Sequence, residues 1–437
     1  MTGETITFRV DDACPADWDE TISGLPGASI LQTAEWGALK GAHGWIPRWL
    51  RWIGADGRTA AAALVLRKKI AGPFEFRYVP RGPLVEAADW ALCERVFTDL
   101  TADARADGAI FLKTDRDVPI GYGVPGSETY REDADGAAWL SLLKRRGFRY
   151  SEAQVQFANS VWIDLTPDEE TLLANMKQRA RYKARLALKK GVSVRRGAES
   201  EFEEFYELYR VTARRDGFII REKAYYLDVW TRFYRAGMMI PLVAGVGNET
   251  VAVVLLFLFA GKAWYVYGMS SGTHREKMPN YALQWEAIRT AKAEGARVYD
   301  LWGAPDVFGE GDRMWGVYQF KRGLGGYEVL SPGAYDLPLR PFLYRAYAAG
   351  LRLLTGARRL FVLILRLFYH SVNIKLQPAF PRSSTLCLFV FIPRLSACLV
   401  FFLIAFVVFI DDGKLVFFAQ LITLITDLVI AFLVRKN

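Results

Sequence analysis

The stretch that decides the fold covers residues 284–326 and reads QWEAIRTAKAEGARVYDLWGAPDVFGEGDRMWGVYQFKRGLGG. Its apolar residues recur at helical spacing as far as Gly295, which predicts a helix that ends at this glycine. The alternation over residues 297–302 predicts a half-buried strand. A loop rich in Gly, Pro and Asp is then expected to carry the chain to Phe320 and Lys321, so that one lysine follows an aromatic residue.

The composition indicates more than one domain and a polyanionic partner. At 437 residues the chain suggests two or three units. A net charge of +9 favours RNA, phosphates or anionic lipid, and charge alone does not choose among them. The four cysteines lie far apart without a CxxC pair, which indicates a reducing compartment and no zinc site or disulfide framework. The N-terminus carries acids and no apolar core, which argues against a secretory signal.

Basic residues are concentrated in the segment from Lys177 to Lys190. If this segment is a helix, Lys177, Arg181, Arg185 and Lys189 share one face at a spacing of four residues. Like charges placed in this way repel one another. A bound polyanion would relieve that repulsion, and the segment is therefore the candidate RNA-binding surface.

The sequence also contains an internal repeat. Residues 58–83 and 249–272 share one plan, in which a polar turn, an apolar strand, a basic turn and an aromatic strand follow one another. An Ala-acid-Gly-Ala turn precedes a strand near residue 108 and again near residue 295, at a similar spacing. Two copies of a mixed unit of strands and helices predict the α+β class, and duplicated units usually meet along a cleft.

Several short motifs, in this order, resemble the FemABX family. They are Leu31–Trp36, Tyr78–Pro83, Arg181–Arg185, Thr212–Phe218 and the pair Phe320–Lys321. That family transfers an amino acid from aminoacyl-tRNA to the stem peptide of a peptidoglycan precursor, either lipid-linked or nucleotide-linked. The resemblance implies two GNAT-like acyltransferase domains, over residues 1–158 and 159–324, with residues 325–345 completing the first sheet. It also implies that aminoacyl-tRNA binds the basic segment 177–190.

The chemistry that this resemblance implies needs no enzyme nucleophile. Forming an amide from an ester needs an amine, a group that takes its proton, and stabilisation of the oxyanion. We therefore expect direct transfer without a metal or a cofactor. The resemblance gives Lys321, with its neighbour Phe320, the role of stabilising the oxyanion; the residues alone would also allow a surface lysine that ends a strand. Asp115, which follows a predicted strand, is a candidate to orient or deprotonate the amine, or is a simple turn residue.

Five further residues are expected to bind the precursor. In the family, the matches of Lys40 and Arg215 contact its phosphates; alternatively, Arg215 pairs with a neighbouring acid such as Asp216. Trp36 shares a short predicted helix with Lys40. Tyr78 and Tyr267 lie near the ends of aromatic strands, where family members contact sugar or peptide, although aromatic strand residues are more often part of the core.

The C-terminal part differs in composition from the rest. Residues 340–370 mix arginines with Leu, Phe and Tyr, as an interfacial amphipathic helix would. Residues 371–437 are largely apolar, which fits either a short membrane hairpin or a tail that folds with nothing. We therefore expect a cytoplasmic enzyme at the inner face of the membrane.

Two other classes of function stay open at this stage. The glycines at 323–326 could hold the pyrophosphate of acetyl-CoA, as in GNAT N-acyltransferases, but they precede a predicted strand and not a helix. The basic segment and the tail would also suit a non-catalytic protein that binds RNA or membrane. Such a scaffold should tolerate the loss of Lys321, whereas a transferase should not.

Overall fold

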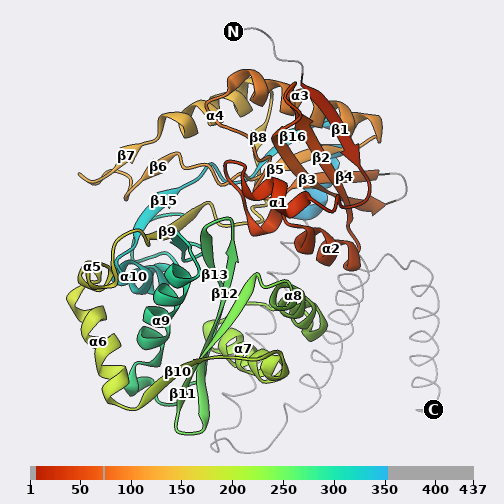
Figure 1. The fold of residues 1–437 in the computed structure, drawn as a ribbon. Helices are drawn as coiled ribbons and strands as arrows, with labels where there is room; N and C mark the ends of the chain where they lie inside the picture. Colours follow the sequence, from red (N-terminus) through yellow and green to blue (C-terminus); the bar gives the residue numbers. More distant parts are fainter. Residues whose placement is uncertain (1–5, 72–73, 353–437) are drawn as a thin grey trace, which may run out of the picture. The chain divides into compact units, whose positions relative to one another are not determined.

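The computed structural model describes residues 6–71 and 74–352 (Figure 1). Met1–Arg340 form one compact unit, and the second unit, Pro341–Asn437, is described only as far as residue 352. Residues 341–352 are helical. The rest of the amphipathic helix predicted for 340–370, and the apolar tail predicted for 371–437, lie outside the described residues.

Sheet A contains seven strands, and only its β4–β5 pair is parallel. In spatial order the strands are β1 (Thr7–Asp11), β2 (Ile46–Ile53), β3 (Thr59–Ala71), β4 (Phe74–Val79), β5 (Phe111–Thr114), β16 (Tyr335–Pro338) and β8 (Arg149–Tyr150). Residues 61–66 of strand β3 are buried on both faces. Its alternate residues Ala61, Ala63 and Val65 pack toward one side of the sheet, because successive side chains of a strand point to opposite faces.

Helices cover both faces of sheet A. The side that receives Ala61, Ala63 and Val65 is closed by α3 (Trp90–Ala106) and α4 (Ala134–Arg145). The other side is closed by α1 (Trp18–Ser23) and by the region of α2 (Ala34–Ala42), with Trp18 and Trp49 at the centre. The 3-10 helix η1 (Ile30–Gln32) lies between α1 and α2 in the chain.

Sheet B contains nine strands, and only its β13–β14 pair is parallel. In spatial order the strands are β10 (Val192–Arg196), β11 (Met239–Val246), β12 (Glu249–Phe259), β13 (Lys262–Ser270), β14 (Val298–Asp300), β9 (Asn159–Asp164), β15 (Tyr327–Leu330), β6 (Gly121–Tyr122) and β7 (Arg131–Glu132). The prediction of a strand over 297–302 is therefore confirmed by β14.

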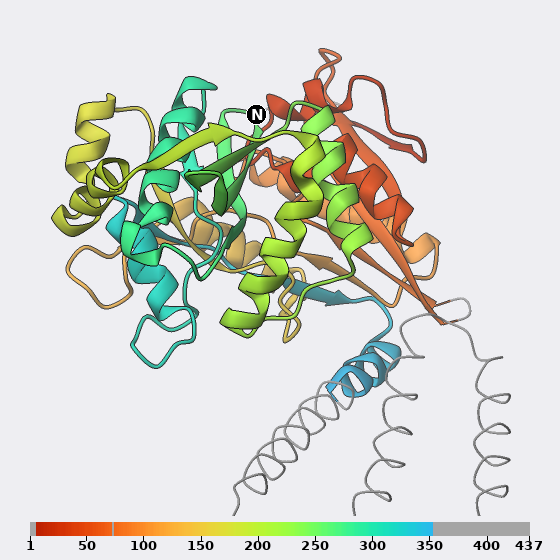
Figure 2. The same ribbon diagram turned by 90° about the horizontal axis from the view of Figure 1, so that it is seen from below.

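Sheet B also has helices on both faces, as Figures 1 and 2 show. One face packs against α9 (Pro279–Ala293), with α5 (Glu169–Asn175), α6 (Gln178–Lys189) and α10 (Trp315–Gly323) on the same side. The opposite face packs against α7 (Phe202–Asp216) and α8 (Lys223–Arg235). Short 3-10 helices, η2 (Glu199–Glu201) and η3 (Arg275–Lys277), precede α7 and α9.

The two sheets repeat one plan. In each, three antiparallel strands lead to a long helix and then to a strand that runs parallel to the third: β2-β3-β4-α3-β5 and β11-β12-β13-α9-β14. The two halves share a core in which Ile30, Leu31 and Leu39 pack with residues of α7, α8, β12 and β13. The α+β class and the duplication predicted from the sequence are therefore confirmed.

More strands belong to the sheet of the other half than the predicted boundaries suggest. Strands β6 and β7 precede residue 158 but belong to sheet B. The segment 325–345, expected to complete the first sheet, contributes β15 to sheet B and β16 to sheet A. A boundary near residue 158 stays a prediction, because Met1–Arg340 form a single compact unit.

Candidate active site

Lys321 lies on helix α10, not at the end of a loop or strand. The loop expected to reach it ends earlier, because residues from Trp315 onward are helical. The side chain is buried, with 3% exposed, so the alternative of a surface lysine is wrong. Its Nζ donates hydrogen bonds to the carbonyl oxygens of Trp302 at 2.8 Å and Gly303 at 2.6 Å. An ammonium has three N–H donors, so one is left for a ligand.

The environment of Lys321 controls its charge. Burial lowers the pKa of Lys321 to about 7, from 10.5 for an ordinary lysine, and the carboxylate of Asp300 opposes this effect. Because burial penalises the charged form, a nearby anion is needed to keep the amine protonated near neutral pH. Asp300 is itself 3% exposed.

Asp115 and Tyr78 are in contact in the first half of the molecule. The Tyr78 hydroxyl donates to Asp115 Oδ2 at 2.6 Å, and the backbone N–H of Arg81 donates to Oδ1 at 2.7 Å. Burial raises the pKa of Asp115, and Arg81 acts in the opposite direction. Both carboxylate oxygens thus accept hydrogen bonds from the protein. In this geometry Asp115 orients Tyr78 and Arg81, and its role toward the amine stays a prediction.

A chain of charges connects this pair with the second half of the molecule. Arg81 lies 3.6 Å from Asp117, and its guanidinium is 5.8 Å from the ring centroid of Trp302. Lys262 then bridges Asp117 at 3.1 Å and Asp300 at 3.0 Å. Burial would raise the pKa of Asp117, but the positive charges of Lys262 and Arg81, together with hydrogen bonds from Lys262 and Ser331, outweigh it and lower that pKa. The structure therefore brings two predicted residues, Tyr78 of β4 and Asp115 directly after β5, close to the surroundings of Lys321.

Phe320 points away from Lys321, as consecutive helical residues do. Its half-buried ring packs edge-on against Tyr281, with centroids 5.0 Å apart. It lines a cavity of about 360 Å³, together with Tyr265, Gln284 and Arg215. Helix α10 thus places Phe320 at a cavity and Lys321 at the backbone carbonyls.

Lys40, Trp36 and Tyr267 belong to one aromatic cluster at α2 and α8. Lys40 Nζ donates to the Tyr225 hydroxyl at 3.0 Å and lies 4.4 Å from the ring centroid of Trp36. Burial lowers the pKa of Lys40 to about 8, and the neighbouring charge of Arg221 acts in the same direction. Tyr267 joins this cluster through Tyr226, whose ring is 5.8 Å away from it and 5.7 Å away from that of Tyr225. Such a cationic site is suited to an anion.

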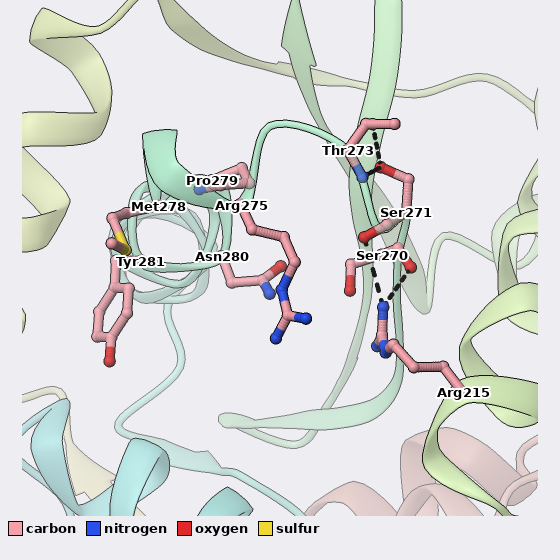
Figure 3. Close-up of a pocket in the computed structure, with 9 residues that line it drawn as sticks. All are labelled: Arg215, Ser270, Ser271, Thr273, Arg275, Met278, Pro279, Asn280 and Tyr281. Carbon is pink, nitrogen blue, oxygen red and sulfur yellow. Dashed lines mark hydrogen bonds between the residues drawn. The ribbon is translucent and has the colours of Figure 1, made fainter.

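Arg215 borders two neighbouring cavities near the end of β13, one of which is drawn in Figure 3. Its guanidinium pairs with Asp216 at 2.8 Å and donates to the Ser270 carbonyl at 2.9 Å. The alternative pairing with Asp216 is therefore present. Arg215 still contributes to the wall of a second cavity, of about 200 Å³, which Arg275 and Tyr281 also line.

The basic segment forms helix α6 as predicted, and it lies beside the cavities. Lys177, Arg185 and Lys189 are exposed, whereas Arg181 donates to the Ala174 carbonyl at 2.8 Å. Lys183 Nζ lies 4.8 Å from the ring centroid of Tyr281, the residue that packs on Phe320. Lys183 lies on a different side of α6 from these exposed residues, so the contact shows only that α6 packs beside Tyr281, which lines the cavity of about 200 Å³.

The sequence reasoning missed four charged residues of this site: Arg81, Asp117, Lys262 and Asp300. Arg81 lies within one of the family motifs and Asp300 within the stretch 284–326, but nothing local marks them as partners. The ion pair between Lys262 and Asp117 joins residues that are 145 positions apart in the sequence. Only the tertiary fold, which places the loops after β4 and β5 beside β13 and β14, brings these groups together.

Two further observations concern metals and membranes. Within residues 6–71 and 74–352, no three His, Cys, Asp or Glu side chains come together in a way that could hold a metal ion. In that same part of the chain, no helix combines the length and the apolar character needed to cross a bilayer.

Known proteins resemble this chain over most of its length. The sequence model of the FemAB family matches residues 24–246 and 241–350. The lipid II:glycine glycyltransferase of Staphylococcus haemolyticus is 25% identical over 396 residues, which cover 75% of this chain and 92% of the relative. The protein of the same name from Staphylococcus aureus strain USA300 is 24% identical over 396 residues, with the same coverage.

The fold is also found in a solved structure. The crystal structure of FemX superposes with a TM-score of 0.69 at 21% identity, and the match covers 78% of this chain and 100% of FemX. This likeness establishes a common fold. Because the family match extends over well more than half of the chain, this protein belongs to the FemAB family.

Proposed function

We propose that this transferase moves an amino acid, with glycine as the first candidate, from aminoacyl-tRNA to an amine of the stem peptide of lipid II. The arrangement of Lys321 supports the proposal most directly, since a buried ammonium with one unused N–H can receive a developing oxyanion. The names of the staphylococcal relatives support glycine and lipid II. The aminoacyl-tRNA is suggested by the exposed cationic face of α6.

The donor would approach from the side of α6. The exposed side chains of Lys177, Arg185 and Lys189 would contact the phosphates of the acceptor stem. The 3′ end would then enter the cavity of about 360 Å³ at Phe320, where an aromatic ring can stack on a base. From this cavity the aminoacyl ester would have to extend past α10 to the remaining N–H of Lys321, which lies on another side of that helix.

The acceptor would bind along β13 and α2. Lys40 and Arg215 would hold the diphosphate of the precursor, while Trp36, Tyr78 and Tyr267 would line the path of the sugar and peptide. Lipid II is membrane-linked, so the enzyme would work at the inner face of the cell membrane. The arginine-rich segment 340–370 would contact the bilayer there.

The reaction itself is a direct aminolysis. The acceptor nitrogen attacks the ester carbonyl carbon, and the carbonyl oxygen becomes an oxyanion that accepts the third N–H of Lys321. The C–O bond to the ribose then breaks, and the proton lost by the amine ends on the departing ribose oxygen. No group of the enzyme forms a covalent bond.

One experiment tests this function. Purified protein is incubated with radiolabelled aminoacyl-tRNAs, one amino acid at a time, and with either lipid II or the nucleotide-linked precursor, and products are identified by mass. Label in the stem peptide of lipid II that depends on glycyl-tRNA is the expected result. Transfer from acetyl-CoA, or tRNA binding without any transfer, would contradict the proposal and favour an acetyltransferase or an RNA-binding scaffold.

A further inference from the structure

The two carbonyls that hold Lys321 come from an irregularity in sheet B. Strand β14 pairs with β9 as far as Asp300, and the ladder continues when Leu301 N–H donates to the Val161 carbonyl at 2.9 Å. Its next bond joins Ala304 N–H to the Asn159 carbonyl at 2.8 Å. Between these two hydrogen bonds the chain after β14 advances three residues, from Leu301 to Ala304, while β9 advances two, from Val161 to Asn159. One extra residue therefore bulges out of the ladder.

This bulge has a strained backbone. Trp302 has a φ of +53° and Gly303 a φ of +95°. The left-handed region costs a non-glycine residue about 1–3 kcal/mol, so surrounding contacts must hold Trp302 in place. The bulge turns the carbonyls of both residues toward the same point, the Nζ of Lys321.

Asp300 is the residue that holds the bulge. Its Oδ1 accepts a hydrogen bond from the backbone N–H of Trp302 at 2.9 Å and another from the Ser160 hydroxyl. Ser160 in turn accepts from the N–H of Gly303 at 3.3 Å. The other oxygen, Oδ2, pairs with Lys262 at 3.0 Å. One carboxylate therefore holds Trp302 directly and Gly303 through the Ser160 hydroxyl.

Contacts from the first half of the molecule fix the other side. Lys262 also pairs with Asp117, and Arg81 Nη2 donates to the Phe157 carbonyl at 2.9 Å. A Cβ at Gly303 would lie 2.7 Å from the Phe157 ring, so this ring packs directly on the bulge. The bulge is thus held between Asp300 and the segment that precedes β9.

We propose that Asp300 is a positioning residue for Lys321, which fixes the Trp302–Gly303 bulge so that its carbonyls aim the Lys321 ammonium at the reacting ester. The inference rests on the proposed function, in which Lys321 receives the oxyanion. Asp300 acts through hydrogen bonds and through its negative charge, and it touches no substrate. Its role is distinct from that of a residue needed only for folding, because it also acts on the protonation of Lys321.

The test compares Asp300→Asn with a matched control. The asparagine keeps the shape of the side chain and an oxygen for the Trp302 N–H, but it removes the charge. Asp164→Asn makes the same change at an exposed position of the neighbouring strand β9, where Asp164 Oδ1 accepts from the backbone N–H of Thr166. Turnover, KM and thermal unfolding are measured for each variant from pH 5.5 to 9.

Asp300→Asn should lower kcat by about 10- to 100-fold, with KM for both substrates within about twofold of the original. The midpoint of the alkaline fall in kcat should move to lower pH by about one unit, because Lys321 loses its nearby anion. The other charged groups near Asp300 are Lys262, Asp117 and Arg81, and the substitution leaves all three side chains in place. Asp164→Asn should leave both quantities unchanged. An unshifted midpoint in Asp300→Asn overturns the proposal.

Ser160→Ala gives a second, independent test. It removes one support of the bulge but keeps the charge of Asp300, so kcat should fall while the alkaline midpoint stays where it is. If the turnover of both Asp300→Asn and Ser160→Ala equals that of the unmodified enzyme, Asp300 does not position Lys321.

A measurement without substrates separates this inference from the proposed function. The titration of the Lys321 ¹³Cε resonance, assigned by its absence in Lys321→Met, should move to lower pH in Asp300→Asn and stay fixed in Asp164→Asn. If the unmodified enzyme transfers no amino acid, the proposed function fails whatever this titration shows. If transfer occurs and the titration does not move, only the role of Asp300 fails.

Discussion

Replacing Lys321 with methionine is the sharpest test of the site. Methionine is similar in length, unbranched and apolar, so it keeps most of the packing of the buried stem while removing all three donors. Loss of one oxyanion donor typically costs 10²- to 10³-fold in kcat, or about 2.7–4 kcal/mol. We expect a loss of that size for Lys321→Met, with KM for both substrates little changed.

The pH dependence of kcat gives a second check, because the charge state of Lys321 fixes the direction in which kcat changes. Lys321 donates from its charged form, and its pKa in the folded protein is about 7. In the unmodified enzyme, kcat should therefore fall about tenfold per pH unit above pH 7. The residual activity of Lys321→Met should lack this fall, because no lysine is left to lose its proton.

The same pKa predicts a change in stability. The folded value of about 7 lies below the 10.5 of an ordinary lysine, so between these pH values the unfolded chain binds more protons. The free energy of unfolding should thus rise with pH from about 7 to 10.5. At about 1.4 kcal/mol per pH unit, Lys321 contributes about 5 kcal/mol to this rise. The contribution of Lys321 is the difference between this rise in the unmodified protein and the rise in Lys321→Met.

The assay is a single-turnover reaction with saturating enzyme, radiolabelled glycyl-tRNA and lipid II, followed from pH 5.5 to 9, with denaturant unfolding measured up to pH 10.5. Single-turnover conditions separate the chemical step from product release. Near-normal turnover of Lys321→Met would refute the reasoning, and the oxyanion donor would then have to be sought elsewhere. An unchanged alkaline fall in the variant would assign that fall to another group.

Three further predictions address the other parts of the site. Arg185→Gln combined with Lys189→Gln should make the salt dependence of tRNA binding shallower, by about one unit of log–log slope for each phosphate that the protein no longer neutralises; equal slopes would exclude α6 as the tRNA surface. Lys40→Ala should raise KM for the precursor with little effect on kcat, and in the unmodified enzyme that KM should rise above pH 8, because the pKa of Lys40 is about 8. A defect confined to kcat would contradict phosphate binding by Lys40. Gly303→Ala should lower both the free energy of unfolding, by about 1–3 kcal/mol in denaturant titration, and kcat, because the new Cβ would lie 2.7 Å from the Phe157 ring; unchanged values would show that the bulge tolerates displacement.

The sequence by itself determined the features that depend only on the spacing of residues within short segments. The helix that ends before Gly295, the strand β14, the cationic helix α6 and the repeated order of strands and helices all follow from the pattern of apolar and charged residues within short windows. The order of the short motifs also led to the correct family. Such signals depend only on neighbours in the chain, because backbone periodicity sets which side chains share a face.

Tertiary structure decided where the charges of the site meet. The same local pattern allowed Lys321 to be an exposed residue after a loop, but packing buries it on α10. Burial is what lowers its pKa and makes Asp300 important, and burial depends on the whole fold. The pairing of Lys262 with Asp117 joins a strand residue to a residue of the loop after β5, 145 positions apart, and no local window specifies that contact. Long-range pairing in a duplicated fold, together with the removal of water around the paired charges, therefore set the electrostatics of this site.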